Sequence, residues 1–157
     1  MGGKPAAGLL KALERISRNG GIIQADPPPK AYGFPGGTHI NYSQQIQENL
    51  WRFKLSPMAR DLLDHMAATH DVDGIVAATQ TALGMYFGCH HSKISRAIKV
   101  LTQHNFAWKA RQGQYQLNPT YAYRWGSRRH RVLIDRLGAK TLKDHTIVIP
   151  LPETRNR

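Results

Sequence analysis

The side chains best suited to chemistry lie between Thr79 and Leu101, where the sequence reads TQTALGMYFGCHHSKISRAIKVL. In its second half, apolar residues recur at helical spacing from Ile94 to Leu101. The opposite face carries hydroxyl, imidazole and cationic groups and no carboxylate, which suits contact with base edges and phosphates in the DNA major groove. An ordinary surface helix, the alternative interpretation, mixes both charge signs. The outward residues are His91, Ser92, Lys93, Ser95, Arg96 and Lys99.

Each outward side chain has a role that its chemistry favours. The guanidinium of Arg96 fits a bidentate contact with guanine. The two serine hydroxyls and the imidazole of His91 suit base edges or phosphate oxygens, and the two lysines suit phosphates. His90 is expected at the cap of the helix, among the DNA contacts.

This helix needs a partner helix, which the preceding stretch supplies. Thr79 is placed to cap that partner, and Thr79 and Gln80 at its start are counted among the DNA contacts. Gly84 leaves room for two helices to cross closely, and Gly88 suits a turn with positive φ. Cys89 follows as a small buried side chain. The spacing therefore predicts a helix-turn-helix.

Two short runs separated by a turn follow the predicted helix-turn-helix. Residues 106–111 and 114–117 flank Gln112-Gly113, a pattern typical of a β-hairpin. A hairpin directly after a recognition helix indicates the wing of a winged helix-turn-helix domain. Its apolar residues are expected to cover the core, while its tip faces the minor groove or the DNA backbone. The tip carries Arg111, Gln112 and Gln114.

The chain after the hairpin is rich in aromatic residues and arginines. The aromatic residues from Tyr121 to Trp125 are expected to pack, with stacking on a single strand of nucleic acid as the alternative. Ser127 is expected to cap a helix that carries Val132 and Leu133. Residues 146–149 have the pattern of a strand ended by prolines. Three arginines at the start of the predicted helix suit contact with phosphates: Arg128, Arg129 and Arg131.

Upstream, Ser56-Pro57 marks the start of a helix that should stop near His70-Asp71. Residues 75–77 have the pattern of a short strand. Apolar anchors that include Trp51 indicate that order begins near Gln44. The first 40 residues hold eight glycines and five prolines, which disfavour regular structure, apart from a short helix over 9–18.

These elements predict a mainly α fold with a small β-hairpin. We expect a flexible N-terminal arm with a short helix at residues 1–43 and a winged helix-turn-helix domain at 44–137. Residues 138–157 then form a C-terminal extension that is a possible dimer contact.

The distribution of charge favours a polyanionic partner. The 157 residues include 22 Lys and Arg against 10 Asp and Glu, a formal net charge of +12. Residues 1–73 carry a net charge of +1 and residues 74–157 carry +11, with no acidic residue between Asp73 and Asp135. Double-stranded DNA is the partner that such a field favours, and a basic surface without a specific partner is the alternative.

The sequence has no features of a membrane protein. We expect no membrane partner, because no stretch approaches the roughly 20 apolar residues of a membrane span and no signal peptide is recognised. The single cysteine excludes an internal disulfide framework. A cytoplasmic location, in association with the nucleoid or a plasmid, is therefore expected.

Two families share these motifs. The segment CHHSKISRAIKVL followed by a hairpin resembles the winged helix-turn-helix regulators of the MarR type. A longer resemblance, over roughly residues 56–137, is to the plasmid replication protein RepL family. It includes the step Leu117-Asn118-Pro119, and Arg124-Trp125-Gly126 is similar to a later Arg-Gly step of that family. The resemblance implies transcription control or replication control of a plasmid or other mobile element, or a RepL-like initiator that binds origin repeats.

A homodimer is expected, because symmetric dimers double the number of DNA half-sites that a single winged domain reads. The N-terminal helix and the chain after Gly138 are the candidate contacts. A small-molecule effector is left open.

An enzymatic function, such as a nicking initiator, is disfavoured. Such enzymes pair a catalytic tyrosine with two histidines separated by one apolar residue on a strand, whereas His90 and His91 are adjacent at a helix start. The acidic residues after Asp73 are too few and too scattered for a two-metal site. No catalytic residue is assigned.

A metal- or redox-sensing repressor is a further alternative. It would use Cys89, His90 and His91, with His104 as a fourth group. Neighbouring residues on one helical turn point in different directions, so three of them rarely reach one ion. We therefore expect no metal and no cofactor.

Overall fold

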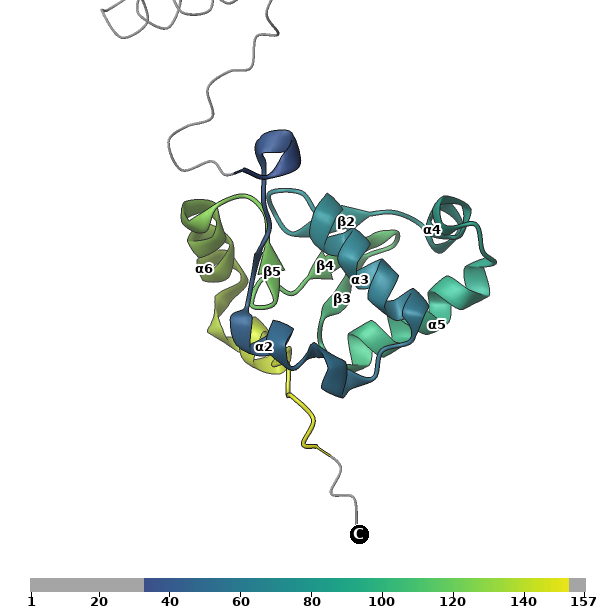
Figure 1. Ribbon diagram of the computed structural model, residues 1–157. Helices are drawn as coiled ribbons and strands as arrows, with labels where there is room; N and C mark the ends of the chain where they lie inside the picture. Colours follow the sequence, from purple (N-terminus) through teal and green to yellow (C-terminus); the bar gives the residue numbers. More distant parts are fainter. Residues whose placement is uncertain (1–32, 153–157) are drawn as a thin grey trace, which may run out of the picture. The chain divides into compact units, whose positions relative to one another are not determined.

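The computed structural model describes residues 33–152 (Figure 1). The chain divides into two compact units, of which the first ends at His39 and the second begins at Ile40. The described part of the first unit contains the short 3₁₀ helix η1 (Pro35–Gly37). The helix expected over residues 9–18 lies outside the described residues.

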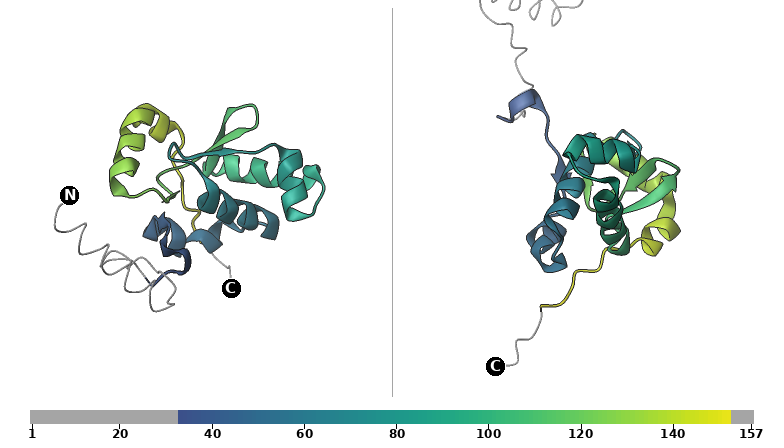
Figure 2. Two further views of the ribbon diagram at one scale, coloured as in Figure 1. Left: turned by 90° about the horizontal axis from the view of Figure 1, so that it is seen from above. Right: turned by 90° about the vertical axis from the view of Figure 1, so that its right-hand side faces the viewer.

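The second unit is a mixed α/β fold in which helices pack around small antiparallel sheets (Figures 1 and 2). Its first elements are strand β1 (Asn41–Tyr42), helix α2 (Gln44–Glu48), the 3₁₀ helix η2 (Leu50–Phe53) and helix α3 (Pro57–Thr69). Strand β2 (Ile75–Ala77), helix α4 (Gln80–Phe87) and helix α5 (His91–Gln103) follow. The unit continues with strands β3 (Ala107–Arg111), β4 (Gln114–Leu117) and β5 (Ala122–Tyr123) and helix α6 (Ser127–Asp144).

Helix α3 confirms the predicted start and stop signals. The hydroxyl of Ser56 accepts a hydrogen bond from the backbone N–H of Ala59 at 3.2 Å, and Pro57 occupies the first helical position. The helix ends at Thr69, and His70 is the C-cap. The hydroxyl satisfies an N–H group that a helix start would otherwise leave without a partner.

The sheet contains the predicted hairpin and one further strand. The strand order is β2-β4-β3, with Val76 opposite Tyr115 and Lys109 opposite Tyr115 on the other side. A separate two-stranded ladder joins β1 to β5, with Asn41 opposite Tyr123. The sequence did not predict this ladder, because its strands are too short to show alternation and lie far apart in the chain.

Helix α6 and the segment after it depart from the sequence-based expectation. Its N-cap is Gly126, with φ of +87°, and no side chain caps the helix, so the predicted capping role of Ser127 is wrong. At Gly138, φ is +84° and the helix kinks. The predicted strand at 146–149 is also absent, because asparagine side chains rather than a strand bind the carbonyl groups of His145 and Thr146.

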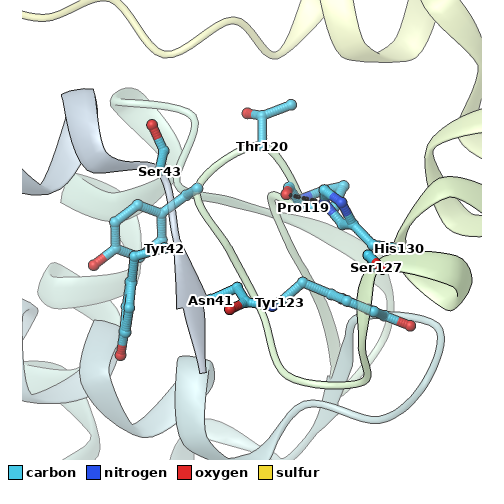
Figure 3. Close-up of a pocket in the computed structure, with 9 residues that line it drawn as sticks. Asn41, Tyr42, Ser43, Pro119, Thr120, Tyr123, Ser127 and His130 are labelled. Carbon is cyan, nitrogen blue, oxygen red and sulfur yellow. Dashed lines mark hydrogen bonds between the residues drawn. The ribbon is translucent and has the colours of Figure 1, made fainter. Parts of the chain in front are cut away.

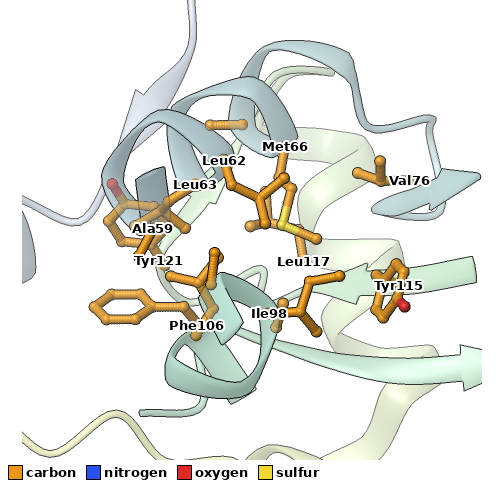
Figure 4. Packing of buried hydrophobic residues seen from close by; sticks show 14 of the residues in the cluster. Ala59, Leu62, Leu63, Met66, Val76, Ile98, Phe106, Tyr115, Leu117 and Tyr121 are labelled. Carbon is orange, nitrogen blue, oxygen red and sulfur yellow. The ribbon is translucent and has the colours of Figure 1, made fainter. Parts of the chain in front are cut away.

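The core joins α3, α5 and the hairpin (Figure 4). Phe106 is fully buried and meets Phe53 and Tyr121 edge-on, with ring centroids 4.8 and 5.1 Å away. The largest fully buried aliphatic side chains of this core are Leu62, Leu63, Met66, Leu83, Ile94, Leu101 and Leu117.

One predicted apolar anchor, Trp51, faces solvent instead. Trp51 is 66% exposed, because the 3₁₀ helix η2 has three residues per turn and so turns Leu50 and Phe53 inward together. Val132 is 64% exposed, whereas its neighbour Leu133 is buried. Leu133 is the only buried residue of α6.

A buried histidine, His70, ties α3 to the segment before α6. Its Nδ1 lies 3.1 Å from the carbonyl oxygen of Met66, and its Nε2 accepts a hydrogen bond from the backbone N–H of Arg124 at 3.1 Å. Because a backbone N–H only donates, the imidazole must be neutral with its proton on Nδ1. Burial lowers the pKa of His70, which keeps it in this form.

Asn118, also fully buried, holds the end of the chain against the hairpin. Its Nδ2 donates to the carbonyl oxygens of Asn105 and His145, both at 2.8 Å. Its Oδ1 accepts from the backbone N–H and the hydroxyl of Thr120, at 3.0 and 2.7 Å. All four hydrogen-bonding positions of the amide are used, which makes this buried polar group stabilising.

Candidate nucleic-acid interface

The turn between α4 and α5 depends on two glycines, as predicted. A Cβ atom on Gly84 would lie 2.7 Å from the carbonyl oxygen of Cys89, so α4 has no room for a side chain there. Gly88 is the C-cap of α4 with φ of +67°. The backbone N–H of Cys89 donates to the carbonyl of Gly84 at 2.9 Å and closes the turn. Cys89 is half-buried and packs against the core.

The start of α5 is capped by an imidazole. The Nδ1 of His90 accepts a hydrogen bond from the backbone N–H of Ser92 at 3.2 Å and lies 2.8 Å from the Ser92 hydroxyl. The rings of His90 and His91 are 4.1 Å apart. His90 is therefore occupied in ordering the first turn of α5, while His91 presents its ring to solvent.

Helix α5 has the orientation that the sequence predicts. Ile94 and Leu101 are fully buried, and Ala97 and Ile98 are also in the core. No ion pair joins any of the basic residues of this helix to a carboxylate within residues 33–152. The exposed residues of α5, hereafter its polar face, are His91, Ser92, Lys93, Ser95, Arg96 and Lys99.

The tip of the hairpin lies beside the start of α4. The backbone N–H of Ala78 donates to the carbonyl of Gly113 at 3.0 Å, and Thr79 caps α4 by accepting from Ala82 at 3.0 Å. Gln80 is half-buried, with its Nε2 3.5 Å from the hydroxyl of Tyr115. The structure thus brings Thr79 and Gln80 next to the tip but already engages both side chains within the fold.

Side chains at the tip differ in their freedom. Arg111 and Gln112 are exposed, and Gln112 accepts a hydrogen bond from the ammonium of Lys109 at 3.1 Å. Gln114 is half-buried where β4 pairs with Ala77 of β2. Arg111 is therefore the tip residue most available to a ligand, and Lys109 is an exposed cation of the hairpin that sequence reasoning missed.

The three arginines of α6 do not join this group. Arg128, Arg129 and Arg131 are all exposed in the first turns of α6. In Figure 1 and in the left-hand view of Figure 2, α6 and the pair α4 and α5 lie on opposite sides of the sheet. The residues assigned to DNA contact therefore fall on two separate surfaces.

A hollow of about 500 Å³ opens between α4 and the start of α5. Its lining includes Met85, Cys89 and His91. Met85 is 81% exposed and its neighbour Tyr86 is 69% exposed, and neither was predicted as a functional residue. The sequence pattern that could have indicated them is a pair of large apolar residues on the outward side of α4, next to the polar face of α5.

A second groove, of about 390 Å³, runs between the start of α3 and α5. Ser56, Pro57 and Met58 form one wall, and Lys93 and Arg96 belong to the other. Two of the three cationic residues of the polar face, Lys93 and Arg96, therefore border an apolar groove rather than a flat surface.

A smaller pocket, of about 220 Å³, lies between the β1–β5 ladder and the start of α6 (Figure 3). Tyr42, Tyr123 and His130 are part of its lining. The Nε2 of His130 donates to the carbonyl of Pro119 at 2.6 Å, which ties α6 to the loop after β4. This volume is below the roughly 300 Å³ of ordinary small-molecule sites.

Within the described part of the chain, no group of three His, Cys, Asp or Glu side chains is arranged to hold a metal ion. In the same residues, no helix combines the length and the hydropathy needed to cross a bilayer. No protein-family model, curated protein or solved structure matches this chain.

Proposed function

We propose that this protein binds double-stranded DNA in a sequence-specific manner through a winged helix-turn-helix domain. In this proposal α4 and α5 are the helix-turn-helix, α5 is the recognition helix and β3 with β4 is the wing. The close crossing at Gly84, the left-handed Gly88 and the hairpin directly after α5 support the proposal.

One observation carries the proposal: the polar face of α5 is fully exposed and lacks acidic side chains, while the opposite face is in the core. Arg96 is suited to guanine O6 and N7, whereas Lys93 and Lys99 suit phosphates. Because no carboxylate among residues 33–152 pairs with these cations, their field remains available to a polyanion.

The biological use that we propose is transcription control or replication control of a plasmid or other mobile element. A RepL-like initiator that binds origin repeats is the alternative, since the same groove chemistry serves both. A footprint distinguishes them: repeated protected sites within an origin indicate initiation, and one palindrome over a promoter indicates regulation.

We also propose that the protein acts as a homodimer, because one α5 reads only a few base pairs. The expected site is then a pair of inverted half-sites. The molar mass measured by light scattering, with and without DNA, checks this part of the proposal separately.

The experiment that tests DNA recognition is selection of bound duplexes from random oligonucleotides. We expect enrichment of a defined motif, followed by tight binding of that motif and weak binding of a scrambled duplex. Typical specific sites bind roughly 10³-fold or more tighter than non-specific DNA. Binding without enrichment of any motif would contradict sequence-specific recognition, and absence of binding would contradict the function as a whole.

A further inference from the structure

We infer that the first turns of α6 form a second DNA-binding surface, which contacts a duplex segment other than the segment bound by α5. This inference rests on the proposed function and extends it from one bound duplex to two. We call Arg128, Arg129 and Arg131 the α6 basic surface.

The fold fixes the direction in which this surface faces. Helix α6 is held by His130, which donates to the Pro119 carbonyl at 2.6 Å, and by Leu133, which is buried. Arg136 continues the same side of the helix and pairs with Asp73 at 2.8 Å. Anchors three residues apart occupy one face of a helix, so Arg128 and Arg131 project away from the body.

The charges on this surface form no ion pair within the described part of the fold. Arg136 forms an ion pair, whereas Arg128, Arg129 and Arg131 form none with any carboxylate among residues 33–152. No acidic residue occupies the first turn of α6. Cations at a helix N-terminus oppose the helix dipole, so this placement costs stability. An arrangement that disfavours the fold and leaves three guanidinium groups exposed favours a role in binding an anionic partner.

The kind of partner follows from the side chains. Arginines carry the fork geometry that matches phosphate. Beside them, Ser127 is the one exposed hydroxyl in the first turns of α6 and the His130 Nε2 is bound to the Pro119 carbonyl, so fewer groups are available to base edges than on α5. Contacts to phosphates alone position a duplex without reading its sequence. The second surface should therefore take any duplex segment, whereas α5 should select one.

The positions of α5 and of the α6 basic surface indicate that the two surfaces bind separate segments of duplex DNA. Helix α5 packs against α3, α4 and β3, whereas the polar anchors of α6 are Asp73 and Pro119. Both surfaces belong to the second unit, and the sheet lies between them in Figure 1 and in the left-hand view of Figure 2. A duplex is stiff over about 150 base pairs, so a short straight segment seated on α5 does not reach α6.

A bridging assay tests the inference with full-length protein. The selected duplex is fixed to beads, protein is added, and capture of a second, labelled duplex of unrelated sequence is measured. We expect wild-type protein to retain the labelled duplex and R128Q/R131Q to retain roughly tenfold less, the scale of two lost phosphate contacts. The same variant should bind a selected duplex of about one helical turn per half-site as tightly as the wild type.

The matched control is K140Q/K143Q, which removes two exposed positive charges from the part of α6 after the kink. We expect it to bridge like the wild type. Thermal unfolding of both variants checks that the fold is retained. If R128Q/R131Q does not fold, Arg128→Lys and Arg131→Lys are tested in its place, and we expect both to bridge because they keep the positive charge.

The outcomes separate this inference from the proposed function. Unchanged bridging by R128Q/R131Q would overturn the inference, because a dimer would then join two duplexes through its two α5 helices. Weaker binding of the short selected duplex by R128Q/R131Q would also overturn it, since both surfaces would then contact one segment. In both cases specific binding through α5 would stand. Absence of DNA binding by the wild type would instead remove the proposed function itself.

Discussion

The carbonyl oxygen of Cys89 lies so close to Gly84 that no side chain fits between them. A Cβ atom on Gly84 would lie 2.7 Å from this oxygen, closer than van der Waals contact allows. This approach lets α4 and α5 cross at the turn and fixes the direction of α5. The polar face of α5 therefore depends on one missing methyl group at a position remote from the face itself.

Substitution of Gly84 tests this relationship. Gly84→Ala should lower the free energy of unfolding by about 1–3 kcal/mol, because the backbone must shift to admit the methyl group. Gly88→Asn is the control: no atom lies within 4 Å of its Cβ position, and asparagine tolerates positive φ better than other residues. Urea unfolding measures both variants. An equal decrease in the free energy of unfolding of both variants would show that the space at the helix crossing does not limit stability.

Arg96 is expected to read a base. Arg96→Ala should weaken binding of the selected duplex by about 1–3 kcal/mol and relax the preference at one position of the motif. Lys99→Ala is the control, because a phosphate contact weakens binding to all sequences alike and lowers the salt dependence. Repeated selection with each variant measures the preference. A motif that stays unchanged with Arg96→Ala would contradict the assignment of Arg96 to a base.

The buried His70 predicts a loss of stability in mild acid. Burial lowers the pKa of His70 in the folded state below its ordinary value of 6.5. The unfolded chain then takes up a proton before the folded chain does, so the stabilisation is complete above about pH 6.5 and declines as the pH falls below it. Protonation would also remove the acceptor that Nε2 offers to Arg124.

Urea unfolding between pH 5 and 8 measures this effect, with NMR titration of the imidazole as the direct check. His70→Gln should remove most of the pH-dependent part, whatever its stability at pH 8. His65→Gln is the comparison, because burial also lowers the pKa of His65, which is only half-buried. A titration of His70 at or above its ordinary pKa would refute the assignment.

Asn118 is expected to stabilise both the hairpin and the end of the chain. Asn118→Ala leaves the carbonyl groups of Asn105 and His145 without their donor and should cost about 2–4 kcal/mol of unfolding free energy. Thr120→Val, which removes only the hydroxyl donor to Asn118, should cost about 1 kcal/mol. Limited proteolysis should cut first after residue 144 in Asn118→Ala. A protease pattern like that of the wild type would contradict the role of Asn118 in holding this segment.

Local chemistry determined the part of the molecule that the sequence predicted well. Hydroxyl caps at Ser56 and Thr79, the left-handed turn at Gly88 and the helical spacing of Ile94 and Leu101 act over a few residues, so they can be read without knowing the fold. The outward direction of the polar face follows from that spacing alone. Its role in DNA binding stays a prediction.

Tertiary structure decided what depends on distant partners. The pairing of Asn41 with Tyr123, the burial of His70 against Arg124 and the bonds from Asn118 to His145 join segments with no shared local pattern. The same holds for the place of the α6 arginines: their number and type are visible in the sequence, but their separation from α5 arises only when the sheet packs between the two helices. Local signals set the elements, whereas burial and satisfied hydrogen bonds between remote residues set their arrangement.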